Sequence, residues 1–206
     1  MGKPIPDRST EAAPAELFQI DELDVGGARV LVRCDFNVPL KDGAITDDLR
    51  ILSAVPTVQR LLARGARVAA CSHLGRPKGR VVEELRLDPI AQRLSEMLHR
   101  QVVKADDVVG DAAVEACASD AAVVLLENLR FEPGEERNDD HFADRLAALA
   151  DAYVDDAFGA AHRAHASIVG VAERLPRAAG LLLADEVEKL TRLMAAPEHP
   201  FVAVLG

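Results

Sequence analysis

The sequence predicts an α/β fold in three layers, a doubly wound and mostly parallel sheet with helices on both faces. Short runs rich in β-branched residues alternate with amphipathic helical stretches along the chain, and repeated strand–helix–strand units fold into such sheets. Hydrophobic residues make up 49% of the 206 residues, enough for a large core. Aromatic residues account for only 3%, so we expect a core built mostly from Leu, Val, Ile and Ala.

Apolar runs bounded by turn residues predict strands over 28–36, 67–72, 101–104, 121–127, 151–156 and 201–205. A tight turn is predicted at 41–43. Apolar residues at helical spacing predict helices after the polar caps at 46–48 and 138–140, and over 87–100, 111–117 and 185–195. Pro56 lies inside the first of these helices, and we expect it to kink or split that helix.

The two ends of the chain carry their own expectations. Residues 1–16 are polar, contain three prolines and lack the apolar segment of a signal peptide. We therefore expect a flexible leader ahead of one domain over 17–206. The strand pattern at 201–205 runs directly into Gly206, which looks like the cut end of a longer chain.

The balance of charges and the cysteines exclude several classes of protein. Lys and Arg number 24 against 34 Asp and Glu, a net charge of −10, whereas nucleic-acid-binding proteins need a basic surface. No apolar run is long enough for a membrane helix. Cys34, Cys71 and Cys117 are widely spaced, which argues against a disulfide framework or a zinc site and suits the cytoplasm.

Basic side chains follow several of the predicted strands. Ligands of open parallel sheets bind beyond the carboxyl ends of the strands, and Arg50 opens the first helix at that edge. The whole set is Arg50, His73, Arg76, Arg130, His162, Arg163 and His165. Guanidinium groups bind carboxylates and phosphates through paired charge-assisted hydrogen bonds. In an acidic chain, this gathering predicts one cleft for a small phosphorylated acid.

Each of these side chains also has a simpler interpretation. A single arginine in a loop is usually a solvated surface charge. Asp35 and Asn37 could merely shape a turn, although a ligand hydroxyl would use the same acceptor and amide groups. Cys71 and Ser72 precede His73, but neighbours on a strand point to opposite faces, so we do not expect a nucleophile–base pair there.

Some well-known motifs are absent from the sequence. The glycines at 75 and 79 are too close together for a P-loop, and the closing Lys-Ser/Thr is missing. No G-x-G-x-x-G segment occurs, which leaves little support for a dinucleotide-dependent oxidoreductase. No set of Cys and His residues has the spacing of a metal site, so we expect none.

Six segments taken together resemble the phosphoglycerate kinase family. VRCDFNVPL, ITDDLRI, SHLGRPKG, LLENLRF, DDAFGAAHRAHAS and PFVAVLG occur in the order and at the spacing of that family. The resemblance covers about residues 18–206 and is specific because six segments match in sequence. It implies a phosphotransferase with a carboxyl group as acceptor. Such an enzyme moves a phosphoryl group reversibly between 1,3-bisphosphoglycerate and ADP in glycolysis, giving 3-phosphoglycerate and ATP.

The resemblance also implies roles for individual residues, since the amino-terminal domain of that family binds the phosphoglycerate. Asp35 and Asn37 match the positions near the glycerate hydroxyl. The positions for its anionic groups are Arg50, His73, Arg76, Arg130 and Arg163, and the supporting basic patch consists of Arg33, His162 and His165. We expect Arg50 to stabilise the transferring phosphoryl group, because this chemistry depends on positioning and charge neutralisation.

The chain departs from the family pattern in two ways. Asp155 stands where the family usually has Asn before Asp156. Family members are also about twice as long, with two domains. We therefore expect the nucleotide-binding domain to be absent and Mg-ATP or Mg-ADP to bind that missing half, with no cofactor or metal on this chain alone.

The expected partners follow from the same resemblance. They are 3-phosphoglycerate or 1,3-bisphosphoglycerate and the missing carboxy-terminal domain, in a cytoplasmic monomer without nucleic acid or membrane partners. Alone, the chain should bind 3-phosphoglycerate weakly and turn nothing over. A second hypothesis is a stand-alone module that binds a phosphorylated acid without catalysis.

Overall fold

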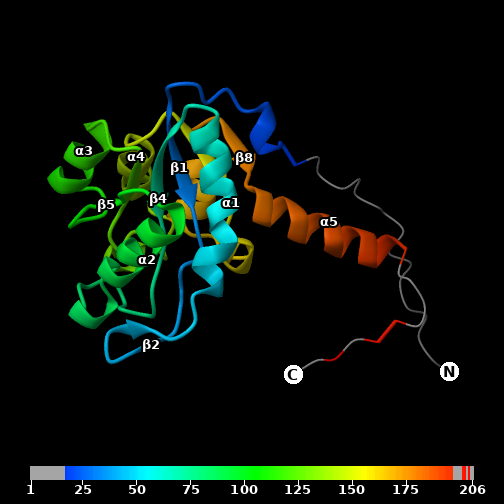
Figure 1. Cartoon of the computed structure of the whole chain (residues 1–206), viewed down its shortest axis with the longest axis horizontal. Helices are drawn as coiled ribbons and strands as arrows, with labels where there is room; N and C mark the ends of the chain where they lie inside the picture. The colour runs from blue at the N-terminus through cyan, green and yellow to red at the C-terminus, as the bar shows by residue number, and fades with distance from the viewer. Residues whose placement is uncertain (1–16, 197–200, 203, 205–206) are drawn as a thin grey trace.

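The computed structural model describes residues 17–196, 201–202 and 204. Its centre is a sheet of six parallel strands in the order β5-β6-β4-β1-β7-β8 (Figure 1). The strands are β1 (Arg29–Arg33), β4 (Arg67–Cys71), β5 (Val103–Lys104), β6 (Val123–Leu125), β7 (Ala152–Asp155) and β8 (Arg177–Ala179). From β1 the chain first builds the sheet on the β4 side and later returns to the opposite side through β7. This is the doubly wound α/β fold that the sequence predicts.

The sheet lies between two layers of helices. Along β1, Val30 and Val32 belong to one apolar core and Leu31 to the other, because successive strand residues point to opposite faces. Helices α1 (Leu49–Ala63) and α2 (Asp88–Leu98) contribute to the first core. Helices α3 (Asp111–Ala118) and α4 (Asp140–Ala147) contribute to the second. Both cores consist mainly of Leu, Val, Ile and Ala, as expected from the composition.

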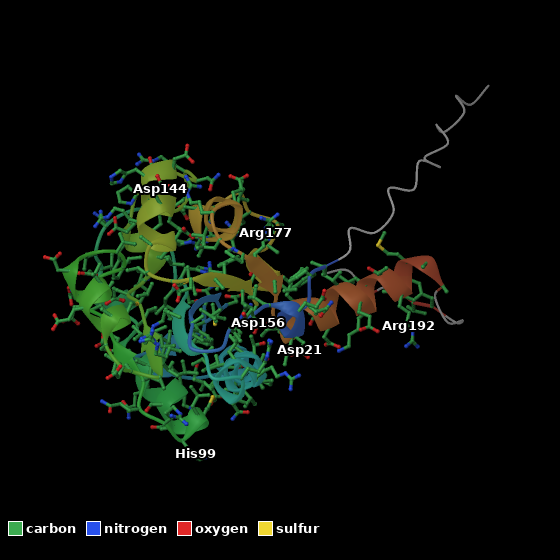
Figure 2. The ribbon with its side chains drawn as sticks, turned by 90° about the horizontal axis from the view of Figure 1, so that it is seen from above. Asp21, His99, Asp144, Asp156, Arg177 and Arg192 are labelled. Carbon is green, nitrogen blue, oxygen red and sulfur yellow. The ribbon has the colours of Figure 1, made fainter. Side chains whose placement is uncertain are left out.

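Helix α5 (Leu181–Ala195) follows β8 and differs from the other helices. Its contacts with the body of the domain are mainly with α1, and Leu183 is its one buried residue. Figure 1 and Figure 2 both show α5 extending away from the sheet. This helix is therefore anchored chiefly at its amino-terminal end.

Short elements complete the chain. The predicted turn at 41–43 is confirmed: β2 (Leu40–Lys41) and β3 (Ala44–Ile45) form a hairpin, with Asp42 and Gly43 at φ 52° and 78° between them. The 3-10 helices are η1 (Ile20–Glu22), η2 (Glu83–Leu85), η3 (Leu129–Phe131), η4 (Phe158–Ala160) and η6 (Val171–Glu173), and η5 (Ala166–Gly170) is a π-helix. Of these, η3, η4 and η5 follow β6 and β7 and carry part of the candidate site.

The structure differs from the expected elements at several places. Pro56 does not split α1, which runs unbroken from Leu49 to Ala63. Pro56 and Leu52 both lie on the exposed face of this helix, where water can replace the hydrogen bond that proline cannot donate. A strand that was not predicted, β8, pairs with β7, and α5 begins four residues before its predicted start at 185.

The strand predicted over 201–205 lies partly outside the described residues, and its described residues are not in a strand. Phe201, Val202 and Val204 have no regular secondary structure and are 49%, 78% and 91% exposed, so no neighbouring strand satisfies their backbone. Residues 203 and 205 lie outside the described residues, as does the predicted leader over 1–16. Among the described residues, no helix combines the length and the apolar character needed to cross a membrane.

Candidate functional site

The carboxyl ends of the four central strands β6, β4, β1 and β7 meet at one edge of the sheet. Asp35 and Asn37 follow β1, His73 and Arg76 follow β4, and Arg130 follows β6. His162, Arg163 and His165 lie after β7, and Arg50 lies in the first turn of α1. We call this edge the carboxyl edge. The predicted residues thus lie on segments that converge at the edge where ligands of parallel sheets bind.

The most buried part of the carboxyl edge is a contact between Arg33 and His73. Arg33 is fully buried, and its Nη2 lies 3.1 Å from Nδ1 of His73. Since a guanidinium can only donate, Nδ1 accepts, and His73 is the neutral tautomer protonated on Nε2. Burial lowers the pKa of His73 to about 2, and the nearby positive charges of Arg33, Arg130, His165 and Arg163 act in the same direction. The positive charges of Arg33, Arg130 and Arg163 therefore gather around a neutral His73.

The buried carboxylate of Glu135 balances part of the positive charge around His73. Oε1 of Glu135 accepts a hydrogen bond of 2.6 Å from the hydroxyl of Ser167, and that hydroxyl accepts one of 2.9 Å from Nε of Arg33. Nδ1 of His165 lies 3.6 Å from the same carboxylate. Burial raises the pKa of Glu135, but His165, Arg33 and Ser167 outweigh it and leave that pKa below its usual value. Glu135 is therefore ionised and fixes the orientation of Arg33.

The segment after β4 is held by side chains that follow β6. Nδ2 of buried Asn128 donates to the carbonyl oxygens of Leu74 and Leu85 at 2.9 and 3.0 Å. Nη1 of Arg130 donates to the carbonyl oxygen of Gly75 at 2.7 Å. Burial lowers the pKa of Arg130. This arginine thus combines a structural hydrogen bond with a charge at the carboxyl edge.

Asp35 and Arg50 form an ion pair on the other side of this edge. The Asp35 side chain is 13% exposed and that of Arg50 is 52% exposed. A small cavity of about 190 Å³ borders the pair and is also lined by Gly159 and by Leu182 of α5. Gly159 has to remain small, since a Cβ there would approach Oδ2 of Asp35 to 2.8 Å. The ion pair with Asp35 thus holds the guanidinium group of Arg50 next to solvent at the amino-terminal end of α1.

The remaining predicted residues have fewer contacts. Oδ1 of Asn37 accepts the backbone N–H of Gly75, 38 positions away, at 2.9 Å, so this side chain links the segments after β1 and β4 and does not merely shape a local turn. Arg76, His162 and Arg163 are exposed. Within the described part of the chain, none of their side chains has a hydrogen bond or an ion pair. The side chains of all three, including the charged guanidinium groups of Arg76 and Arg163, are therefore available to an anion.

Asp155, where the family usually has Asn, accepts the backbone N–H of Ala157 at 2.9 Å. Burial raises its pKa. Its neighbour Asp156 is fully buried and lies at the amino-terminal end of α5, where Oδ1 accepts the N–H of Leu182 at 2.9 Å. The two carboxyl groups thus accept hydrogen bonds from backbone amides, and neither forms an ion pair with a described arginine.

Sequence reasoning missed the supporting residues Glu135, Ser167 and Asn128. Glu135 lies in the acidic segment 132–140, whose composition is typical of a solvated loop, but it is fully buried. The partners Arg33 and Ser167 are 134 positions apart, so no local pattern connects them. The segment 132–140 did carry one signal, because Asp139, which caps α4, lies within the cap predicted over 138–140.

Comparisons with known proteins identify the family of this chain. The model of the family described as "Phosphoglycerate kinase" matches residues 20–206. The phosphoglycerate kinase of Pelotomaculum thermopropionicum is 57% identical over 189 residues, which are 91% of this chain and 48% of that protein. The phosphoglycerate kinase of Moorella thermoacetica is 58% identical over 189 residues, with the same two shares.

Solved structures show the same similarity. The structure of phosphoglycerate kinase from Coxiella burnetii has a TM-score of 0.79 and 40% identity, covering 90% of this chain and 47% of that one. The crystal structure of the enzyme from Pyrococcus horikoshii OT3 has a TM-score of 0.81 and 32% identity, covering 89% and 47%. The chain spans about half the length of the curated relatives it matches. It belongs to the phosphoglycerate kinase family.

Proposed function

We propose that this chain is the phosphoglycerate-binding half of a phosphoglycerate kinase. The whole protein would transfer a phosphoryl group reversibly between 1,3-bisphosphoglycerate and ADP, giving 3-phosphoglycerate and ATP in glycolysis. Family membership supports the reaction. The observation that carries the assignment of the binding half is the buried contact of Arg33 with His73, surrounded by Arg130, Arg163 and His165. Such a cluster favours a ligand with several negative charges.

The roles of the substrate-binding residues follow from their surroundings. Arg76 and Arg163 are exposed and lack partners among the described residues, so we assign them to the anionic groups of the substrate together with Arg130 and His73. Neutral His73 can offer its Nε2–H to a phosphate or carboxylate oxygen. Asp35 and Asn37 would meet the glycerate hydroxyl. Arg33 and His165 are buried, so they and the exposed His162 would supply charge around the substrate rather than its main contacts.

Arg50 is our candidate for the catalytic residue. Asp35 holds its guanidinium at the edge of a cavity of about 190 Å³. Phosphoryl transfer spreads charge over the oxygens of the transferring group, and a fixed guanidinium stabilises that charge without covalent chemistry. We therefore propose that Arg50 contacts the transferring group, and that the other arginines position the acceptor carboxylate.

The site for the nucleotide is expected outside this chain. The family implies Mg-ATP or Mg-ADP, but the described residues contain no cluster of His, Cys, Asp or Glu that could hold a metal ion. We propose that a separate nucleotide-binding domain of the whole protein binds it, and that residues 17–206 alone do not turn over substrate. We also propose that the protein is cytoplasmic, since all three cysteines are buried free thiols, and that it is a monomer.

The proposal can be tested by titrating the ¹⁵N-labelled chain with 3-phosphoglycerate and following the spectra by NMR. We expect saturable shifts at Gly75, His73 and Arg163. Arg163→Gln should weaken binding about tenfold, because it removes one charge-assisted hydrogen bond. The effect should shrink as salt increases. Arg100→Gln is a matched control, since Arg100 is an exposed arginine at the end of α2.

Other outcomes of this titration would count against the proposal. Absence of saturable shifts at the carboxyl edge would overturn the assignment of the binding half. A loss in Arg130→Gln that does not depend on salt would assign Arg130 a structural role, as its hydrogen bond to Gly75 allows. Failure of the whole protein to form ATP from 1,3-bisphosphoglycerate would overturn the enzymatic function and leave a phospho-acid-binding module.

A further inference from the structure

A second cavity lies at the opposite edge of the sheet, where the strands begin. It has a volume of about 490 Å³ and is lined by the first residue of β1, Arg29, and the first residue of β4, Arg67. Residues of α3, the end of α4 and the segment before β7 form the rest of its wall. We call it the amino-edge cavity. Because it lies at the other end of the strands, it is separate from the proposed phosphoglycerate site.

Three arginines line the amino-edge cavity, and their charges lack a carboxylate partner. Arg29, Arg67 and Arg145 all border it. Among the described residues, none of the three forms an ion pair. The acidic residue in the wall is Asp151, and its Oδ2 accepts the backbone N–H of Arg29 at 2.8 Å. Three positive charges thus face one negative charge in a chain of net charge −10.

The guanidinium groups keep donors that could bind a ligand. Arg29 donates to the carbonyl oxygens of Ala121 and Ser119 at 2.8 Å each, and Arg145 donates to that of Val109 at 2.7 Å. Arg67 makes one longer contact of 3.3 Å. Each guanidinium has five N–H donors, so most of those on Arg67 and Arg145 are unused by described residues. Nε of Arg29 is buried without a hydrogen-bond partner.

Burial makes this charge arrangement costly without an anion. Arg29 is 3% exposed, and burial lowers its pKa while the neighbouring charge of Arg67 acts in the same direction. An anion placed between these side chains would offset that repulsion. Arg29 has hydrogen bonds to carbonyl oxygens but no carboxylate partner, and a buried charge is most stable when it is both hydrogen-bonded and paired.

The rest of the wall is apolar. Val109, Val114, Cys117 and Leu149 line the cavity together with alanines of α3 and α4. Val114 is 53% exposed, so a ligand in the cavity could cover it. The volume falls in the range of about 300 to 1,000 Å³ that small-molecule sites occupy. A polyphosphate would place charge against this apolar wall, whereas a molecule with one charged end would not.

We propose that the amino-edge cavity binds a small organic carboxylate that has an apolar body. The carboxylate lies among Arg29, Arg67 and Arg145, which donate paired hydrogen bonds to its oxygens. The apolar body lies against Val114 and Leu149. This site does not depend on the proposed kinase reaction, because it shares no residue with the carboxyl edge.

The test is an NMR titration of the ¹⁵N-labelled chain with 4-phenylbutyrate. We expect saturable shifts at the amides of Val109, Val114 and Leu149. Butyrate, which lacks the phenyl group, and 4-phenyl-1-butanol, which lacks the charge, should each bind at least about tenfold more weakly. Arg67→Gln and Arg145→Gln should each weaken phenylbutyrate binding about tenfold. Arg100→Gln, on the opposite layer of helices, should leave it unchanged.

A further variant keeps the test decisive if an arginine variant unfolds. Val114→Glu places a carboxylate in the wall at an exposed position, so it should preserve the fold, as circular dichroism would check, and abolish phenylbutyrate binding. Unchanged binding in this variant would overturn the proposal. So would a titration without saturation, which would leave the arginines as clamps for main-chain carbonyls. Shifts at His73 that 3-phosphoglycerate reverses would move the binding to the carboxyl edge and equally overturn it.

Discussion

The guanidinium of Arg33 lies 3.1 Å from Nδ1 of His73, and both side chains are buried. This contact couples β1 to the segment after β4, since Arg33 is the last residue of β1 and His73 lies two positions beyond β4. The arginine is fixed on its other side by Ser167 and, through it, by Glu135. A charged donor held in this way can be accommodated only if the histidine stays neutral.

The first prediction concerns the protonation of His73. The pKa of this residue, lowered to about 2, lies far below that of an unfolded histidine, near 6.5. Above pH 6.5 neither state binds the proton. As the pH falls below 6.5, the unfolded state binds a proton that the folded state does not, so His73 lowers the free energy of unfolding by about 1.4 kcal/mol per pH unit.

The measurement is urea unfolding of the chain and of His73→Gln between pH 7 and pH 4.5. The variant should lose stability less steeply than the wild type as the pH falls, because glutamine does not titrate. His141→Gln serves as a control, since His141 is exposed at the start of α4. A histidine signal of His73 that titrates near pH 6.5 by NMR would contradict the prediction.

Much of this fold could be predicted from the sequence, because the signals are local. The strands β1, β4, β6 and β7 are rich in Val, Leu, Ala and other apolar residues. The apolar periodicity of α2 and the Asp139 cap of α4 are likewise visible in neighbouring residues of the sequence. Strand β8 could not be predicted, since its three residues include one Arg and two Ala. It is a strand because β7 offers it a partner.

In the candidate site, too, some features could be predicted from local sequence and others depend on contacts between distant segments. Arginines and histidines that follow parallel strands can be recognised from their positions alone, and their roles in binding phosphoglycerate stay predictions. The buried support could not be recognised: Glu135 resembles any loop acid in sequence and acquires its function only where Ser167, Arg33 and His165 surround it. The same holds for the amino-edge cavity, where Arg29 and Arg145 come from distant segments.

A second prediction concerns Asp156, which accepts a hydrogen bond from the first turn of α5. Burial raises the pKa of Asp156 to about 6, although Thr57 and the N–H groups of Leu182 and Leu183 act against it. An unfolded aspartate has a pKa near 3.9. Between about pH 4 and pH 6 the folded state binds a proton that the unfolded state has lost, so this group lowers the free energy of unfolding as the pH rises.

Asp156→Asn removes this titration and keeps an oxygen for the two N–H groups of α5. From pH 4 to pH 7 the stability of the variant relative to the wild type should increase by about 3 kcal/mol, two pKa units at about 1.4 kcal/mol each. Urea unfolding at both pH values measures it, with Asp120→Asn as the exposed control. A stability difference that is independent of pH would show that Asp156 titrates normally.

A third prediction concerns Gly180, which precedes α5. Its φ of −71° is accessible to any residue, but a Cβ there would come within 2.2 Å of Oδ1 of Asp156. Gly180→Ala should therefore push the carboxylate away from Leu182 and destabilise the chain by about 1 to 3 kcal/mol. Gly26→Ala is the matched control, because a Cβ at Gly26 has no atom within 4 Å.

Urea unfolding gives the stability of both glycine variants, and amide hydrogen exchange at Leu182 shows where the change occurs. In Gly180→Ala the amide of Leu182 should exchange faster, since it loses its hydrogen bond of 2.9 Å to Asp156. Equal stability of the two variants would mean that the carboxylate can move away without loss, and that it does not anchor α5.

The last prediction separates catalysis from binding at Arg50. The Arg50–Asp35 ion pair is half exposed on the arginine side, and such pairs contribute only about 0 to 1 kcal/mol to stability. Arg50→Ala should therefore leave the chain folded. If Arg50 contacts the transferring phosphoryl group, its contact strengthens in the transition state, and kcat of the whole protein should fall about a hundredfold or more while KM changes little.

Arg60→Ala provides the comparison, because Arg60 lies on the same helix, is 49% exposed in its side chain and also forms an ion pair, with Asp21. It should leave kcat and KM unchanged. Steady-state kinetics of both variants in the whole protein measure the difference. An increase of KM alone in Arg50→Ala would show that Arg50 binds the ground state as strongly as the transition state. The role in stabilising the transferring group would then be wrong, and Arg50 would belong with the arginines that position the acceptor.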